Sequence, residues 1–87
     1  MKKSELEDGM FVITRDGWVA MVVNGKLIST KSWDTLEYYN EDLQSIYHFS
    51  KCDIVKIYSI EHTQGFDILA TESFIAENGK LVWERTE

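Results

Sequence analysis

The sequence has no proline and only one cysteine, Cys52. A single cysteine excludes an internal disulfide bond and is typical of a protein kept in a reducing cytoplasm. Without proline, no residue marks an edge strand or ends a helix by the loss of its backbone N–H group. The strand pattern must therefore be inferred from the apolar residues and the few glycines.

Long hydrophobic runs are also absent. The longest apolar run, residues 18–23, is far too short to cross a bilayer. Residues 1–8 are basic and then acidic, and they lack the apolar stretch of a secretory signal. We therefore expect a soluble cytoplasmic protein that does not bind membranes.

Basic residues are scarce, with 9 Lys and Arg against 15 Asp and Glu and a formal net charge of −6. This balance argues against direct binding of nucleic acid or anionic lipid, because both need a surplus of positive charge. The 87 residues are enough for one domain, residues 1–87, with little material left for a deep active site. A basic protein is the partner that such a surface favours.

Three apolar, β-rich runs lie between residues 10 and 30, and the dipeptides Asp16-Gly17 and Asn24-Gly25 separate them. Such dipeptides predict β-hairpins with type I′ turns, in which both central residues have positive φ. Both faces of the first two runs are apolar. We expect these strands to be covered on both sides or closed into a small barrel.

The second half of the chain predicts further strands at residues 46–49, 54–60 and 80–85, the last with Leu81 and Trp83 on one face. Residues 66–78 are ambiguous between a short helix and the first half of a hairpin. The dipeptide Asn78-Gly79 predicts a third turn, or a helix end with glycine in the left-handed conformation.

Five to six short strands with tight turns, and no helical crossovers between parallel strands, predict a mainly β protein. The short chain and its consecutive hairpins favour a small antiparallel SH3-like barrel or roll, with room for one short helix. Open strand edges would also allow a homodimer.

Residues 31–43 differ from the rest, because acidic and aromatic side chains are concentrated there without a basic residue after Lys31. The segment is long for a connection between strands, and long ordered loops are often functional. Exposed Trp and Tyr are frequent anchors of protein interfaces. With Trp18, which follows a hairpin turn, the segment gives the candidate partner-binding residues Trp18, Trp33, Asp34, Glu37, Tyr38, Tyr39, Glu41 and Asp42.

Four motifs in order along the chain suggest a family: Leu-Glu-Asp-Gly-Met at 6–10, Leu-Glu-Tyr-Tyr-Asn-Glu-Asp-Leu at 36–43, Asp-Ile-Val-Lys-Ile-Tyr at 53–58 and Leu-Val-Trp-Glu-Arg at 81–85. In these motifs the chain resembles small uncharacterised proteins encoded by phages and prophages of low-GC Gram-positive bacteria. The resemblance implies a phage accessory protein in the host cytoplasm, and it transfers no catalytic residue.

Reactive groups are few. His48, Cys52 and His62 are the only candidates for metal or thiol chemistry, and a zinc site needs four ligands, or three and a water, while no second cysteine pair is present. No phosphate-binding glycine loop and no nucleophile elbow are present. We therefore predict no catalytic residue, no metal site and no cofactor, and the protein is not expected to be an enzyme.

The sequence thus predicts a non-catalytic protein-interaction module whose partner is an unidentified host or phage protein. Two alternatives stay open. The protein could be an acidic DNA mimic that inhibits a host nucleic-acid-binding protein, in which case binding weakens steeply with salt. It could also be a small-molecule binder or sponge that stacks a nucleotide on its aromatic side chains.

Overall fold

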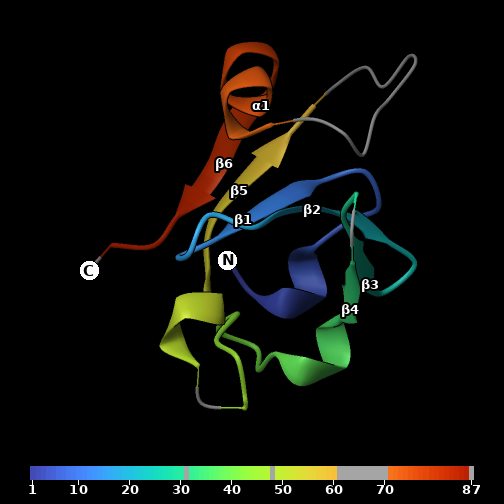
Figure 1. Cartoon of the computed structure of the whole chain (residues 1–87), viewed down its shortest axis with the longest axis vertical. Coiled ribbons are helices and arrows are strands. Elements are labelled where there is room, and N and C mark those ends of the chain that lie inside the picture. The colour runs from blue at the N-terminus through green and yellow to red at the C-terminus, as the bar shows by residue number, and fades with distance from the viewer. Residues whose placement is uncertain (31, 48, 61–70, 87) are drawn as a thin grey trace.

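The computed structural model describes residues 1–30, 32–47, 49–60 and 71–86, which form one antiparallel sheet with strand order β4-β3-β2-β1-β5-β6 (Figure 1). The strands are β1 (Phe11–Thr14), β2 (Val19–Val23), β3 (Lys26–Ile28), β4 (Trp33–Thr35), β5 (Ile54–Ser59) and β6 (Lys80–Glu84). The mainly β, antiparallel fold predicted from the sequence is confirmed.

One α-helix and three short 3-10 helices complete the described structure. The α-helix, α1 (Glu72–Asn78), starts where the hydroxyl of Thr71 accepts a hydrogen bond of 3.2 Å from the N–H of Phe74, as an N-cap should. The 3-10 helices are η1 (Lys3–Glu5), η2 (Leu36–Tyr38) and η3 (Ser50–Cys52). Figure 1 shows α1 at one end of the long axis and the β4–β5 connection, which carries η2 and η3, at the other.

The two predicted hairpin turns differ in kind. Asn24 and Gly25 have φ values of 51° and 79°, so the β2–β3 turn has the positive φ angles of the predicted type I′ turn. At the β1–β2 turn only Gly17 has positive φ, 92°, and Thr14 and Trp18 close a three-residue loop. That geometry corresponds to a type I turn followed by a glycine bulge, so the type I′ prediction was wrong there.

The sheet has a hydrophobic core on each face because β1 is buried along its whole length. On one face, Val12 packs with Leu27, Ile57, Tyr39 and Leu43, and we call this group the connection-side core. Its remaining buried members are Ala20, Val22 and Ile54. Alternation along β1 places Phe11 and Ile13 on the opposite face.

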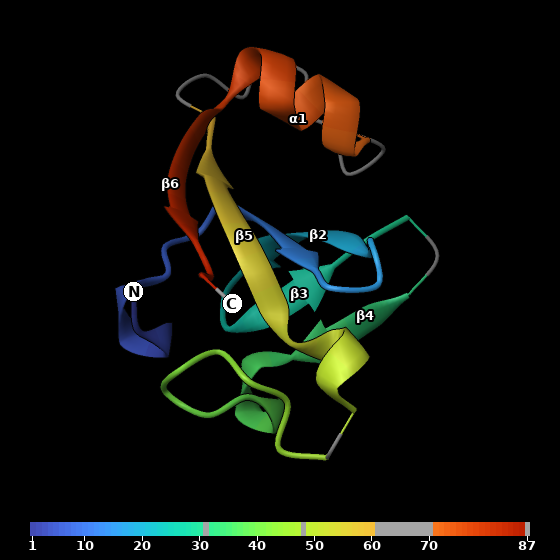
Figure 2. The same cartoon turned by 90° about the vertical axis from the view of Figure 1, so that its left-hand side faces the viewer.

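On that opposite face lies the helix-side core, in which Phe11, Ile13 and Tyr58 pack against Ile75 of α1. Ile75 is the buried residue of α1, so one side chain attaches the helix to the sheet. Figure 2 shows α1 lying across the end of the sheet near β5 and β6. Lys56 of β5 adds a salt bridge of 3.7 Å to Glu72 at the start of this helix.

The sheet is open, so the predicted SH3-like barrel is wrong. In the described residues β4 and β6 form the two edges, whereas a barrel would pair its first and last strands. The face that a barrel would enclose is instead filled by Tyr39 and Leu43 of the connection, with Leu6 from the N-terminal segment. Because these side chains already bury the apolar face, the sheet does not need to curl closed to protect it.

Several local predictions are settled by the backbone. The β5 and β6 strands are confirmed, but residues 46, 47 and 49 are not in a strand. Leu81 pairs with Tyr58 and Trp83 with Ile57, with an irregularity between them, so Leu81 and Trp83 lie on opposite faces rather than one. The extra residue in β6 reverses the alternation on which the prediction relied.

Of the two alternatives at Asn78-Gly79, the structure has the helix end, and Gly79 is extended, with φ of −108°, rather than left-handed. A Cβ atom at Gly79 would lie 2.8 Å from the carbonyl oxygen of Ile75 and 3.2 Å from that of Ser59. Glycine is therefore needed at this position for space, because the helix turns directly into β6 beside the end of β5.

In the described part of the chain, no helix has the length and apolar character required to span a bilayer.

Candidate interaction site

The eight candidate residues separate into a pocket group and a surface group. Trp18, Trp33, Asp34 and Tyr39 line one pocket. Glu37, Tyr38, Glu41 and Asp42 are exposed on the β4–β5 connection outside it. Tyr39 is only 3% exposed, so its ring belongs to the connection-side core as well as to the pocket wall.

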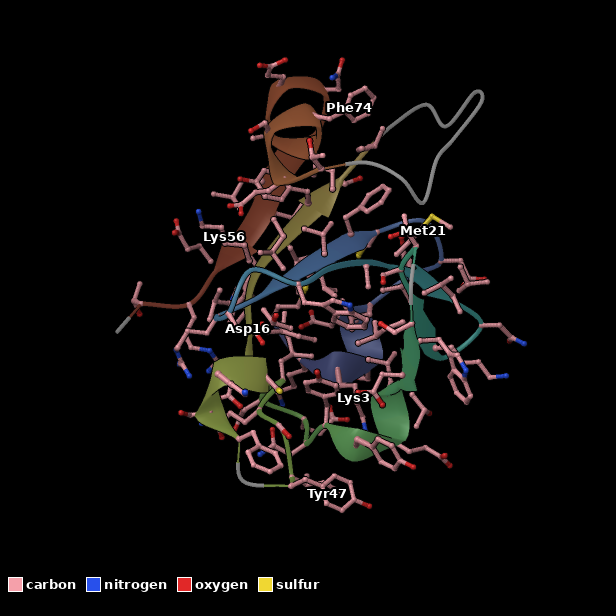
Figure 3. All side chains as sticks on the ribbon, viewed as in Figure 1. Lys3, Asp16, Met21, Tyr47, Lys56 and Phe74 are labelled. Carbon is pink, nitrogen blue, oxygen red and sulfur yellow. The ribbon has the colours of Figure 1, made fainter. Side chains whose placement is uncertain are left out.

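The exposed group is accompanied by apolar side chains that sequence reasoning missed. Ile46, Tyr47 and Phe49 are 45%, 53% and 59% exposed, and Tyr38 is 42% exposed. The rings of Tyr38 and Tyr47 meet edge to face with their centroids 4.9 Å apart. The N–H of Ile46 also donates to the carbonyl of Tyr38 at 2.9 Å, and we call Tyr38, Ile46 and Tyr47 the distal apolar patch. Figure 3 shows Tyr47 at the end of the molecule away from Phe74 of α1.

The missed residues left a weak signal in the sequence. The run from Ile46 to Phe49 is apolar and aromatic, and we predicted a strand because β-rich residues favour strands. Among the described residues of the connection, strand-like pairing is instead limited to one isolated bridge between Tyr39 and Ser45. Without strand neighbours, Ile46 and Tyr47 are left on the surface.

Polar contacts fix the start of the connection to the N-terminal segment. The ammonium group of Lys3 donates hydrogen bonds to the carbonyl oxygens of Tyr39 at 2.8 Å and Leu36 at 3.3 Å. The backbone N–H of Lys3 donates to the carbonyl of Glu41 at 2.9 Å. The connection therefore has a defined shape although it contains little regular secondary structure.

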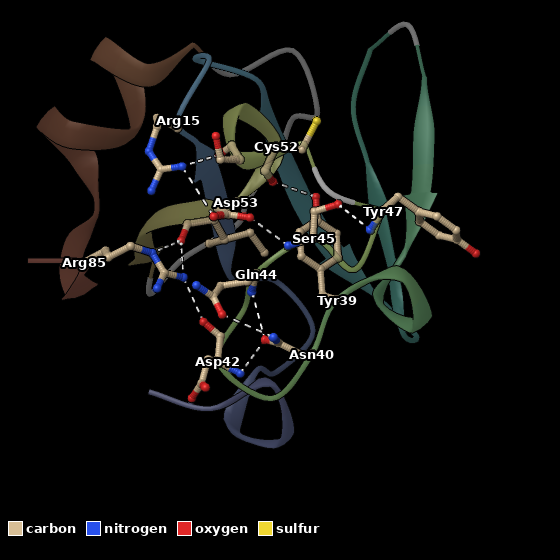
Figure 4. A network of polar contacts seen from close by, with 12 residues as sticks. Arg15, Tyr39, Asn40, Asp42, Gln44, Ser45, Tyr47, Cys52, Asp53 and Arg85 are labelled. Carbon is tan, nitrogen blue, oxygen red and sulfur yellow. Dashed lines mark hydrogen bonds and ion pairs between the residues drawn. The ribbon is translucent and has the colours of Figure 1, made fainter. Parts of the chain in front are cut away.

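A second set of contacts, drawn in Figure 4, fixes the rest of the connection. The side-chain oxygen of Asn40 accepts hydrogen bonds from the N–H groups of Asp42 at 2.8 Å and Gln44 at 3.1 Å. The guanidinium group of Arg85 donates to the carbonyl of Asp42 at 2.8 Å. These contacts give the segment the rigidity that a binding surface needs to avoid a large entropic cost on association.

Asp53 joins the end of the connection to the β1–β2 turn. Its carboxylate, in a residue only 7% exposed, accepts a hydrogen bond of 2.8 Å from the N–H of Ser45. It also lies 3.4 Å from the guanidinium group of Arg15. A buried carboxylate with both a hydrogen bond and an ion pair is a structural link rather than a free acid.

The pocket lies between the β1–β2 turn, β4 and η3, and has a volume of about 170 Å³. Aromatic rings and two carboxylates form most of its lining. Its lining residues are Thr14, Asp16, Trp18, Ser32, Trp33, Asp34, Tyr39 and Cys52. Asp16 was missed as a site residue although its place in a turn two residues before Trp18 was visible in the sequence.

The aromatic walls of the pocket are held in place. The indole N–H of Trp18 lies 3.2 Å from the hydroxyl oxygens of both Ser29 and Ser32 and donates to them. The hydroxyl of Tyr39 donates to the carbonyl of Cys52 at 3.0 Å (Figure 4). Trp33 is 63% exposed at the rim, and the ammonium group of Lys26 lies 5.3 Å from the centre of its ring.

The pocket is electrostatically negative. Burial, followed by the negative charge of Asp34, raises the pKa of the Tyr39 hydroxyl above its ordinary value. Burial also raises the pKa of the Cys52 thiol, and the carboxylate of Asp16 adds to the effect while Lys51 opposes it. A thiol with a raised pKa is a poor nucleophile at neutral pH, so the surroundings of Cys52 do not activate it.

Among the described residues, no group of three or more His, Cys, Asp and Glu side chains is placed to hold a metal ion. His48 and His62, which we had considered with Cys52, lie outside the described residues.

Comparison of the chain with protein-family models, with curated proteins and with solved structures found no match.

Proposed function

We propose that the chain is a non-catalytic protein-interaction module that binds a positively charged partner through the distal apolar patch and the carboxylates around it. The observation that carries the proposal is the exposed Tyr38–Tyr47 pair, with ring centroids 4.9 Å apart. Tyrosine anchors interfaces efficiently, because its large rigid ring loses little conformational entropy on binding.

Charge supports a basic partner. Residues 32–50 contain Asp34, Glu37, Glu41 and Asp42 but no Lys or Arg. The last three of these acidic residues are exposed on the same connection as the patch. Carboxylates at the rim of an interface increase the association rate with a basic protein and disfavour acidic ones.

The resemblance to phage and prophage proteins suggests where such a module would act. The partner in this proposal is a host or phage protein in the cytoplasm of the infected cell. A non-catalytic role is supported by the chemistry of Cys52, because burial and the nearby Asp16 disfavour its thiolate form.

Affinity capture from host lysate, followed by mass spectrometry, tests the proposal. The double variant Tyr38→Ala/Tyr47→Ala should lose the partner that the wild-type chain captures. Phe74→Ala is the matched control, because Phe74 is a 48% exposed aromatic at the opposite end of the molecule. Equal capture by the double variant and the control, with all proteins folded, would contradict the proposed surface.

The DNA-mimic alternative is favoured by the acidic surplus and predicts a different pattern. In a mimic, the carboxylates carry the binding, so Glu37→Gln/Glu41→Gln/Asp42→Asn should abolish capture while Tyr38→Ala/Tyr47→Ala has little effect. In the proposed module, loss of the rings abolishes capture, and loss of the charges mainly slows association. Comparing the two variants at two salt concentrations separates these mechanisms.

A further inference from the structure

The pocket between the β1–β2 turn, β4 and η3 is concave and lies apart from the Tyr38–Tyr47 pair that carries the proposed function. A cavity needs roughly 10–15 Å³ to hold one buried water. The volume of about 170 Å³ therefore admits the polar end group of a long side chain together with part of its aliphatic chain. The pocket is therefore large enough for one functional group and too small for a folded segment.

The carboxylates of the pocket, those of Asp16 and Asp34, can accept further hydrogen bonds. Among the described residues, the hydrogen bonds to the Asp16 carboxylate use its Oδ1 atom, which accepts from the hydroxyl of Thr14 and from the N–H of Trp18. Those of Asp34 likewise use Oδ1, which accepts from the N–H of Thr35 at 2.8 Å. Within the described ranges, no lysine or arginine forms a salt bridge with either carboxylate.

Its aromatic surface is preorganised. Trp18 is fixed by two serine hydroxyls and Tyr39 by the carbonyl of Cys52, so a ligand would not have to order either ring. Trp33 completes the rim, and the centre of its ring already lies 5.3 Å from one cation, the ammonium group of Lys26. Aromatic faces and carboxylates together attract cations and repel phosphate, which disfavours a nucleotide in this pocket.

We propose that this pocket binds one guanidinium group, of the kind an arginine side chain carries. A guanidinium is planar and weakly hydrated, so it stacks on an indole more readily than an ammonium does. Its N–H groups can donate to the Oδ2 atoms of Asp16 and Asp34, which accept none of the hydrogen bonds described above. The inference deepens the proposed function by naming a side chain that a basic partner would insert.

The test uses ethylguanidinium as the probe, at constant ionic strength, with tryptophan fluorescence as the readout. We expect saturable binding, and weaker binding of ethylammonium. Asp34→Asn should weaken binding about tenfold, as expected for loss of one charge-assisted hydrogen bond. Glu77→Gln is the matched control, since it removes the same charge at an exposed position of α1 outside the pocket, and should change affinity less than about twofold.

A second readout keeps the test independent of fluorescence and of small folding defects. Cys52 lines the pocket, so bound ethylguanidinium should shield its thiol and slow alkylation in the wild-type chain, and Asp34→Asn should need about tenfold more of it for the same effect. The absence of saturable binding, equal binding of ethylammonium, or equal response of Asp34→Asn and Glu77→Gln would each overturn the proposal.

A competition experiment distinguishes two sources of the guanidinium group, an arginine side chain of a protein and a small guanidinium compound. A short peptide with blocked termini, in which one central arginine is the sole charged group, should compete with ethylguanidinium if the natural ligand is an arginine of a protein. A peptide that fails to compete, while free ethylguanidinium binds, would overturn the assignment to a protein side chain and leave a small guanidinium compound as the ligand. These titrations contain no partner protein, so their failure would leave capture through Tyr38 and Tyr47 unaffected.

Discussion

The hydroxyl of Tyr39 donates a hydrogen bond of 3.0 Å to the backbone carbonyl of Cys52. The bond joins the residue that follows η2 to the last residue of η3, thirteen positions later in the chain. It closes the connection into a loop over the connection-side core and fixes one wall of the pocket. The two ends of an irregular segment are thus held together by one buried side chain.

Replacing Tyr39 with Phe should lower the free energy of unfolding by about 1 kcal/mol, because the carbonyl of Cys52 loses its partner while the ring still fills the core. Urea unfolding measures the change. Tyr38→Phe is the control and should leave stability unchanged, since Tyr38 is exposed. Equal effects of the two substitutions would contradict a specific role for the Tyr39 hydroxyl.

The same residue should make stability dependent on pH in the alkaline range. The folded protein raises the pKa of Tyr39, chiefly by burial, so the neutral phenol stabilises the fold. That contribution is complete below the ordinary tyrosine pKa of about 10 and is lost as the pH rises above it. Between about pH 9 and 11, wild type should therefore lose stability faster than Tyr39→Phe. Parallel pH curves for the two proteins would show that Tyr39 does not titrate differently on folding.

Cys52 should react slowly with iodoacetamide compared with the unfolded chain, because its pKa is raised by burial and by Asp16, against the opposing effect of Lys51. The pH–rate profile should move to lower pH in Asp16→Asn and to higher pH in Lys51→Ala. Shifts of the same sign in both variants would contradict this electrostatic explanation.

Two glycines should respond differently to asparagine. Gly25 has φ of +79° and open space around it, and asparagine tolerates that conformation, so Gly25→Asn should cost less than about 1 kcal/mol. Gly79 lacks space for a Cβ atom, so Gly79→Asn should cost about 1–3 kcal/mol. Thermal unfolding ranks the two variants, and a more stable Gly79→Asn would contradict the steric argument.

Asp53→Ala should lower the free energy of unfolding by about 1–3 kcal/mol, because the N–H of Ser45 loses its acceptor and Arg15 its carboxylate. Asp42→Ala, at an exposed position where the backbone carbonyl contacts Arg85, should change stability by less than about 0.5 kcal/mol. Urea unfolding of both variants tests whether the buried position of Asp53 accounts for the difference.

The candidate site was predicted in part. Composition identified the acidic, aromatic connection, because charge and ring content need no knowledge of packing. It could not separate Tyr38 from Tyr39, which are adjacent in sequence but 42% and 3% exposed. That difference arises because Tyr39 turns into the core beneath the sheet while Tyr38 remains outside against Tyr47.

The sequence alone determined part of the local structure: the hairpin at Asn24-Gly25 and the strands β1, β2, β3, β5 and β6 follow from backbone sterics and apolar periodicity over a few residues. It left residues 66–78 ambiguous between a helix and a hairpin, and it did not predict β4. Only the tertiary structure decided that the sheet stays open and that Asp16, Asp34 and three aromatic rings meet in one pocket. Those features depend on which distant segment covers each face of the sheet. Tyr39 and Leu43 can bury the same apolar surface that closure of a barrel would bury, and local patterns do not distinguish the two solutions.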